Sequence, residues 1–174
     1  MSACCVSASG RGYSAYRLYL TGCKWPPKGA LPVFYKFGEN TLITGLNHLT
    51  IALTDLSRSF DFYMDVLGFE PQGRWNKGAY LSAGDLWLCL TLDCAMPAKD
   101  YTHCAFSVNE ADFANSVIKL ENYGSTCWKK NSSEGSSFYF LDPDGHKLEI
   151  HCGDLKSRLL AVELKPYSGW SYPK

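Results

Sequence analysis

Two histidines and one glutamate fall where β-strand alternation would expose them on one face of a strand. His48 lies in a stretch of alternating residues, and His103 takes the matching place in a predicted strand over 101–108. Glu149 lies in a third such stretch, where its apolar neighbours take the opposite face. Two imidazoles and one carboxylate on separate strands suit a divalent metal ion with open coordination positions. A single strand histidine is more often structural, but two at matching positions, with a glutamate, favour the metal site.

A polar loop between two predicted strands is the second candidate site. Residues 128–139 contain serine hydroxyls, Asn131 and backbone carbonyls that could coordinate a cation, and Lys129, which could hold an anion. On composition alone, an ordinary solvated loop is the commoner interpretation. Arg158, in a predicted helix, is likewise more often a surface charge. Three aromatic residues are more often core than site residues: Trp75, Tyr80 and Trp87.

The elements that would position these residues occur twice. After the first strand, Asp55 offers an N-cap, apolar residues recur at helical spacing, and Gly68 supplies a helix stop; three strand candidates follow. The same order returns with a helix over 110–121, a stop at Gly124 and three strands, the last two joined by the turn 142–145. The sequence therefore predicts an α+β fold of two βαβββ modules.

One domain over residues 42–174 is expected to contain both modules. They would cover about 46–95 and about 100–152, followed by a C-terminal segment over 153–174. Residues 1–41 carry five basic residues against one acid, without periodicity, which indicates a loosely ordered extension. We hypothesise that this extension is dispensable and is an upstream reading-frame extension rather than native protein. The alternative is a genuine tail that contributes to stability.

Charge and cysteine usage exclude several classes of protein. The 17 basic and 17 acidic residues give a formal net charge of zero, which argues against a nucleic-acid or membrane-surface partner. No stretch approaches the ~20 apolar residues of a membrane helix. The eight cysteines include no Cys-x-x-Cys pair, and no clear secretory signal precedes them. A reducing cytoplasm without disulfides is therefore expected.

From Gly45 to about Tyr167 the sequence resembles the fosfomycin-resistance glutathione transferases of Gram-negative bacteria, within the vicinal-oxygen-chelate (glyoxalase/bleomycin-resistance/dioxygenase) superfamily. The turn Asp-Pro-Asp-Gly is shared widely and indicates only the fold. The run Ser-Glu-Gly-x-Ser-Phe-Tyr-Phe, with Trp-Lys upstream, is far more specific. The matching stretches are 46–50, 74–75, 78–80, 84–90, 100–103, 128–129, 131, 133–135 and 137–149.

This resemblance implies a role for each candidate residue. It implies a homodimer in which His48 and His103 of one site come from different subunits. The implied Mn²⁺ ligands are His48, His103 and Glu149. The implied K⁺ ligands lie in Asn131, Ser133, Gly135 and Ser137. The implied substrate contacts are Thr50, Lys129, Ser133, Tyr139 and Arg158 around the phosphonate, with Trp87 as a wall of the pocket. The implied catalytic residues are Thr50 and Tyr80, of which Tyr80 lies near the incoming thiol.

The activity implied is addition of glutathione thiolate to the epoxide of fosfomycin, with the divalent ion as Lewis acid.

Three alternative functions remain. An epoxide hydrolase of the same fold needs a carboxylate base, yet Gly78 lies in the segment where it is expected and Asp85 is the nearest acid. An extradiol dioxygenase usually has four modules. A drug-sequestering dimer of the bleomycin-binding type lacks the metal triad.

Overall fold

The computed structural model describes residues 42–171. The fold described below belongs to one compact unit of the chain, 44–174. The hypothesis about residues 1–41 lies outside the described residues. Within the described part of the chain, no helix is long and apolar enough to cross a membrane.

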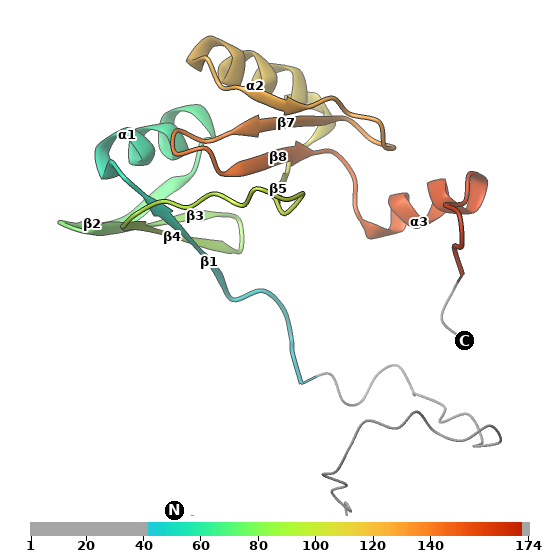
Figure 1. The fold of residues 1–174 in the computed structure, drawn as a ribbon, viewed down its shortest axis with the longest axis horizontal. Helices are drawn as coiled ribbons and strands as arrows, with labels where there is room; N and C mark the ends of the chain where they lie inside the picture. Colours follow the sequence, from blue (N-terminus) through green and yellow to red (C-terminus); the bar gives the residue numbers. More distant parts are fainter. Residues whose placement is uncertain (1–41, 172–174) are drawn as a thin grey trace, which may run out of the picture. The chain divides into compact units, whose positions relative to one another are not determined.

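The first module closes by pairing its first strand with its last (Figure 1). Its elements are β1 (His48–Leu53), α1 (Leu56–Asp61), the π-helical turn η1 (Phe62–Val66), β2 (Glu70–Trp75), β3 (Gly78–Ala83) and β4 (Leu86–Leu92). The strand order is β1-β4-β3-β2, with β1 parallel to β4 and the other pairs antiparallel. The side chain of Asp55 accepts a hydrogen bond from the Arg58 backbone N–H, which caps α1 as predicted.

The second module repeats this arrangement. Its elements are β5 (Cys104–Ser107), α2 (Glu110–Tyr123), β6 (Cys127–Lys129), β7 (Ser137–Leu141) and β8 (Lys147–His151), followed by α3 (Leu155–Leu164). The strand order β5-β8-β7-β6 has the same parallel closure. Gly124 ends α2 in the left-handed conformation, with φ of 83°. The predicted α+β fold of two βαβββ modules is confirmed.

The predicted strand over 101–108 is wrong at its start. Strand β5 begins at Cys104, so His103 lies in the turn before the strand. Asp100 forms this turn by accepting a hydrogen bond from the Thr102 backbone N–H at 2.9 Å. Lys147 Nζ also donates to the carbonyl of Asp100. These local bonds compete with strand pairing and hold His103 in place.

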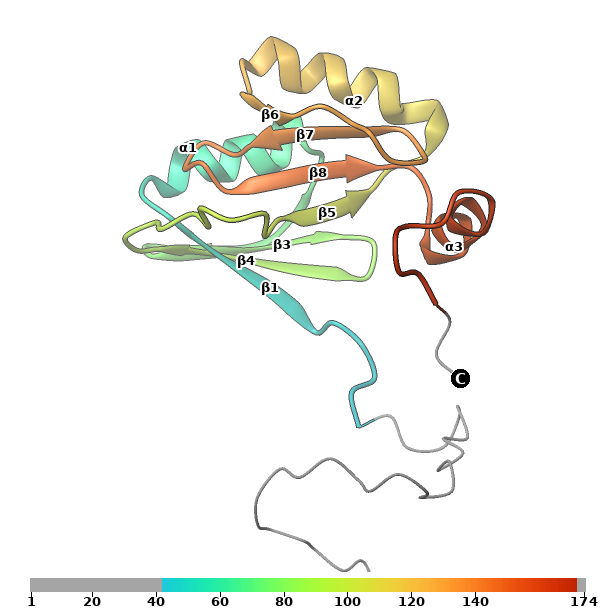
Figure 2. The same ribbon diagram turned by 45° about the vertical axis from the view of Figure 1, so that its right-hand side comes forward.

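Each sheet has one face in the core and one face outside it. Leu88, Leu90, Leu148 and Ile150 belong to a single buried cluster that also includes side chains of α1, η1 and α2. Figure 2 shows α2 lying along β6 and β7. Strand alternation then directs residues 48, 50, 87 and 149 to the faces opposite the core. Those opposite faces are where the candidate site residues lie.

The turn between β7 and β8 joins the two modules. Asp144 accepts hydrogen bonds from Thr54 and Ser59 and forms an ion pair with Arg58 at 2.9 Å. Burial raises the pKa of Asp144, but these hydrogen bonds outweigh it, so the pKa is lowered overall. His146 Nε2 donates to the carbonyl of Ala52 at 2.7 Å. The widely shared Asp-Pro-Asp-Gly turn therefore fixes one module against the other.

Candidate functional site

A cavity of about 900 Å³ opens on the outer face of the second sheet. The floor comes from β7 and β8, and α3 supplies one wall. Six of the predicted site residues line it: His103, Lys129, Ser133, Tyr139, Glu149 and Arg158. Sequence positions up to 55 residues apart, from 103 to 158, thus converge on one space.

His103 and Glu149 form a close pair in this cavity. His103 Nε2 lies 3.0 Å from Glu149 Oε2, and its Nδ1 lies 2.9 Å from the carbonyl of Tyr101. Glu149 is only 6% exposed, on a strand whose neighbours pack in the core. A buried carboxylate beside an imidazole, both reaching an open cavity, is a donor set that divalent metals accept.

The ammonium of Lys129 is held among aromatic rings beside this pair. Lys129 Nζ donates to the hydroxyl of Tyr101 and lies 4.4 Å from the ring centre of Tyr139. The hydrogen bond to Tyr101 raises the pKa of Lys129, so the ammonium stays protonated at neutral pH. The cavity therefore presents a fixed positive charge next to a carboxylate–histidine pair.

The loop between β6 and β7 is folded around its own polar groups. Asn131 Nδ2 donates to the carbonyl of Gly135 at 2.8 Å, and Asn131 Oδ1 accepts from both the N–H and the hydroxyl of Ser133. Ser137 Oγ lies at the other end of the loop, 2.7 Å from His151 Nδ1. Of the four residues predicted to bind K⁺, three therefore lie in this oxygen-rich loop, and Ser137 follows it as the first residue of β7.

Arg158 reaches the cavity from α3 and meets this loop. Its Nη1 lies 3.0 Å from Glu134 Oε2, an oxygen that is buried and makes no other polar contact in the described structure. Asp154 and Ser157 form a capping box that fixes the start of α3 and hence the position of Arg158. The arginine that sequence alone left as a surface charge is therefore part of the cavity wall.

The remaining predicted residues lie on the outer face of the first sheet. Trp87 contacts His48 with ring centroids 4.6 Å apart, and Tyr80 lies 5.3 Å from Trp87. Trp87 and Tyr80 are 40% and 41% exposed. Thr50 shares this face, because it pairs with Cys89 two positions beyond the pairing of His48 with Trp87.

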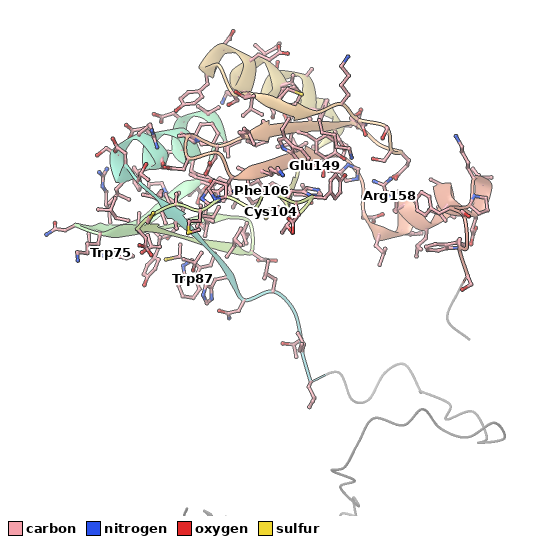
Figure 3. All side chains as sticks on the ribbon, viewed as in Figure 1. Trp75, Trp87, Cys104, Phe106, Glu149 and Arg158 are labelled. Carbon is pink, nitrogen blue, oxygen red and sulfur yellow. The ribbon has the colours of Figure 1, made fainter. Side chains whose placement is uncertain are left out.

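The structure therefore separates the predicted site into two halves. Figure 3 shows Trp75 and Trp87 at the first sheet, whereas Glu149 and Arg158 lie at the second sheet and α3. Among residues 42–171, no three histidine, cysteine or acidic side chains are grouped to hold a metal ion. One chain brings His103 and Glu149 together and leaves His48 elsewhere.

Several cavity residues were given no role from sequence, among them the polar residues Tyr101, Glu134 and His151. Alternation placed His151 on the face of Glu149, which was the available signal. Alternation likewise placed Tyr101 on the face of His103, whereas Glu134 carried no such signal, because its contact with Arg158 depends on a loop.

Comparison with known proteins identifies the family. Residues 45–150 match the model of the Glyoxalase/Bleomycin resistance protein/Dioxygenase superfamily, and the chain belongs to this superfamily. Within it, the chain is 53% identical over 133 residues to "Glutathione transferase FosA" of Serratia marcescens, covering 74% of this chain and 94% of that protein. It is 34% identical over 134 residues to "Metallothiol transferase FosB" of Staphylococcus epidermidis, covering 72% and 96%.

A solved structure has the same fold. It is a mutant of the fosfomycin resistance protein FosX of Listeria monocytogenes, complexed with Mn(II) and 1S,2S-dihydroxypropylphosphonic acid. The TM-score is 0.61 at 25% identity, covering 68% of this chain and 99% of that one.

Proposed function

We propose that this protein inactivates fosfomycin by catalysing the addition of glutathione to its epoxide. The sulfur forms a bond to an epoxide carbon, the C–O bond breaks, and the thiol proton ends on the released oxygen. The observation that carries this proposal is the 53% identity to a glutathione transferase along nearly its whole length. The cavity, which places a fixed cation beside His103 and Glu149, supports it.

A divalent metal, with Mn²⁺ as the candidate ion, fits the donor atoms present. His103 and Glu149 would hold it together with His48, and a buried carboxylate is more stable beside a cation. The chemistry that such an ion supplies is Lewis-acid stabilisation of the negative charge that develops on the epoxide oxygen. The Mn(II) in the FosX structure supports this choice for a protein of the same fold.

The chain's own residues account for binding and orientation. Lys129 and Arg158 supply two positive charges at one cavity, and an anionic phosphonate would offset both. The hydroxyls of Ser133 and Tyr139 line the same cavity and can donate hydrogen bonds to phosphonate oxygens. Holding the phosphonate at these points orients the epoxide carbon for attack.

The first sheet would contribute residues to both the phosphonate and the thiol ends of the site. The hydroxyl of Thr50 would donate a hydrogen bond to the phosphonate, and Trp87 would form a wall of the pocket. Tyr80, exposed beside Trp87, would lie near the glutathione sulfur. These roles require the outer face of the first sheet to meet the cavity of the second.

A homodimer meets this requirement. His48 has no contact with His103 or Glu149 within the described residues, so a second copy of the chain would supply it. Dimers with twofold symmetry create two such sites at once.

We also propose K⁺ as the ion of the loop 131–137, because its side-chain and backbone oxygens are hard, neutral ligands. The cytoplasm, where free thiols persist, is the proposed compartment; the described cysteines are free thiols.

The residue at position 78 argues against an epoxide hydrolase of the same fold. A Cβ built at Gly78 would lie 2.5 Å from the Leu90 carbonyl and 2.5 Å from the Trp75 ring, so the position has no room for a carboxylate side chain. Asp85 lies exposed in the turn between β3 and β4. Gly78 has no carboxylate and Asp85 is not among the residues that line the cavity, so neither position supplies a base there and an external thiol is the better nucleophile.

Mass spectrometry of the products tests the proposal. Fosfomycin is incubated with the protein, Mn²⁺ and K⁺, with and without glutathione. We expect the glutathione adduct in the first mixture and unchanged fosfomycin in the second. A diol formed without glutathione would indicate the hydrolase, and unchanged, tightly bound fosfomycin in both mixtures would indicate the sequestering protein.

A further inference from the structure

The imidazole of His151 lies between the two proposed cation sites. On β8, His151 pairs with Ser137 of β7, two residues beyond the pair of Glu149 with Tyr139. Its Nδ1 lies 2.7 Å from Ser137 Oγ and 3.7 Å from Glu149 Oε1. The Nδ1 atom is thus within hydrogen-bond distance of a proposed K⁺ ligand and slightly farther from a proposed divalent-metal ligand.

The opposite edge of the ring fits against two glycines. A Cβ at Gly135 would lie 2.9 Å from His151 Cε1, and one at Gly153 would lie 3.0 Å from His151 Nε2. Both glycines have positive φ, 79° and 132°, a conformation that other residues rarely adopt. The backbone therefore closes over the ring and leaves it little freedom to rotate.

We infer that His151 is a positioning residue that orients Ser137 for the loop cation, in the tautomer whose Nδ1 accepts the hydroxyl proton of Ser137. This inference rests on the proposed function, because it requires the loop to bind a monovalent cation. A serine oxygen that coordinates a cation must turn its hydroxyl proton away. Nδ1 is the acceptor that the described structure places within reach of that proton.

The same tautomer serves Glu149. With Nδ1 accepting from Ser137, the ring has no proton to donate toward Glu149 Oε1. That carboxylate oxygen keeps its lone pairs for a metal ion. His151 would thus let the two proposed cation sites lie side by side without competing for one hydrogen bond.

Cation binding to the full-length protein without fosfomycin tests the inference. The melting temperature is measured against KCl concentration, with choline chloride holding the ionic strength constant. His151→Leu removes the acceptor, and His151→Asn can restore an oxygen near the position of Nδ1. Ser136→Ala is the matched control, because Ser136 donates away from the loop, to Glu110 at 2.9 Å.

We expect His151→Leu to raise the half-saturating KCl concentration about tenfold, as loss of one hydrogen bond at a cation ligand would do. His151→Asn should recover most of this loss, and Ser136→Ala should match the unaltered protein. An unchanged half-saturating concentration in His151→Leu would overturn the inference while leaving the cation site intact. No effect of KCl on the unaltered protein would overturn both.

The tautomer is a second test that needs no substitution. Nitrogen-15 NMR of the unaltered protein in KCl should show Nε2 protonated and Nδ1 unprotonated for His151. A proton on Nδ1 would contradict the inference even if His151→Leu failed to fold.

Discussion

At the scale of single residues, Glu149 is a buried acidic side chain at the candidate site. Glu149 is 6% exposed, and among residues 42–171 its basic partners are two imidazoles, His103 at 3.0 Å and His151 at 3.7 Å. Burial of an ionised group is costly unless a cation compensates it. The position is therefore poor as a structural residue and well suited to a metal ligand.

Glu149→Gln tests this role with little change of shape. We expect the variant to fold, with a melting temperature within a few degrees, but to lose Mn²⁺ affinity by about 100-fold or more and to lose turnover with it. Titration calorimetry and the glutathione-adduct assay measure the two effects. Glu121→Gln, on the exposed side of α2, is the control. Full Mn²⁺-dependent turnover in Glu149→Gln would refute the ligand assignment.

Among the elements, the loop between β6 and β7 depends on a glycine for its path. Gly135 has φ of 79°, and a Cβ there would lie 2.4 Å from the carbonyl of Cys152. Any side chain would push the loop away from the end of β8. Because the loop ends at Ser137, the displacement would spread its oxygen atoms.

Gly135→Ala should therefore abolish activation by K⁺ while leaving the core intact. Gly84→Ala is matched to it, because Gly84 also has positive φ but no atom within 4 Å of its Cβ. Both variants should lose about 1 kcal/mol of stability from backbone strain. Activity in KCl and in NaCl at equal ionic strength separates them: equal K⁺ activation in the two variants would show that the loop's path is unimportant.

The turn between β7 and β8 should make stability depend on pH. The pKa of Asp144 is lowered in the fold, so its ionised form stabilises the protein above about pH 4, and this stabilisation is lost as the pH falls through the lowered value. Asp144→Asn should cost about 1–2 kcal/mol at neutral pH. The cost should shrink in acid.

Urea unfolding at several pH values measures this cost. Asp61→Asn, an exposed position on α1, should leave the free energy of unfolding unchanged throughout. A constant difference between Asp144→Asn and the unaltered protein at all pH values would mean that the lowered pKa makes no contribution.

Much of this element pattern could be predicted from sequence, for reasons that particular residues show. Residue alternation predicts strands over 86–92, 137–141 and 147–151, and these are the bounds of β4, β7 and β8, since each strand is dominated by its own apolar face. The start of β5 could not be predicted, because hydrogen bonds from Thr102 and Lys147 decide it.

The site was less predictable than the fold. Periodicity gives the face of a strand but not which face meets which, so the separation of His48 from the other two ligands followed only from the family resemblance and not from the spacing of residues. Contacts made by loops, such as that of Glu134 with Arg158, left no pattern in the sequence. Resemblance to a family, rather than spacing, suggested the role of Arg158, whereas the polar loop itself suggested that Lys129 holds an anion.

For the whole molecule, the two separated halves predict that activity requires two chains. His48→Ala and His103→Ala should each be inactive, but an equimolar mixture should regain about one quarter of the sites, because half of the dimers are mixed and each mixed dimer has one intact site. The adduct assay after subunit exchange measures the recovery. Native mass spectrometry confirms exchange; mixed dimers without activity would mean that each chain builds its own site.

The tryptophans next to the two histidines give the molecule an optical readout. Trp87 lies 4.6 Å from His48, and Trp128 lies 5.6 Å from His103, so each half of the proposed metal site has its own fluorophore. Paramagnetic Mn²⁺ bound between them would quench the fluorescence of both tryptophans, whereas Mg²⁺ would leave their fluorescence intensity unchanged. Trp87→Phe and Trp128→Phe would each remove the reporter of one half, and the quenching of the other could then be followed above the emission of the three remaining tryptophans as the ion arrives.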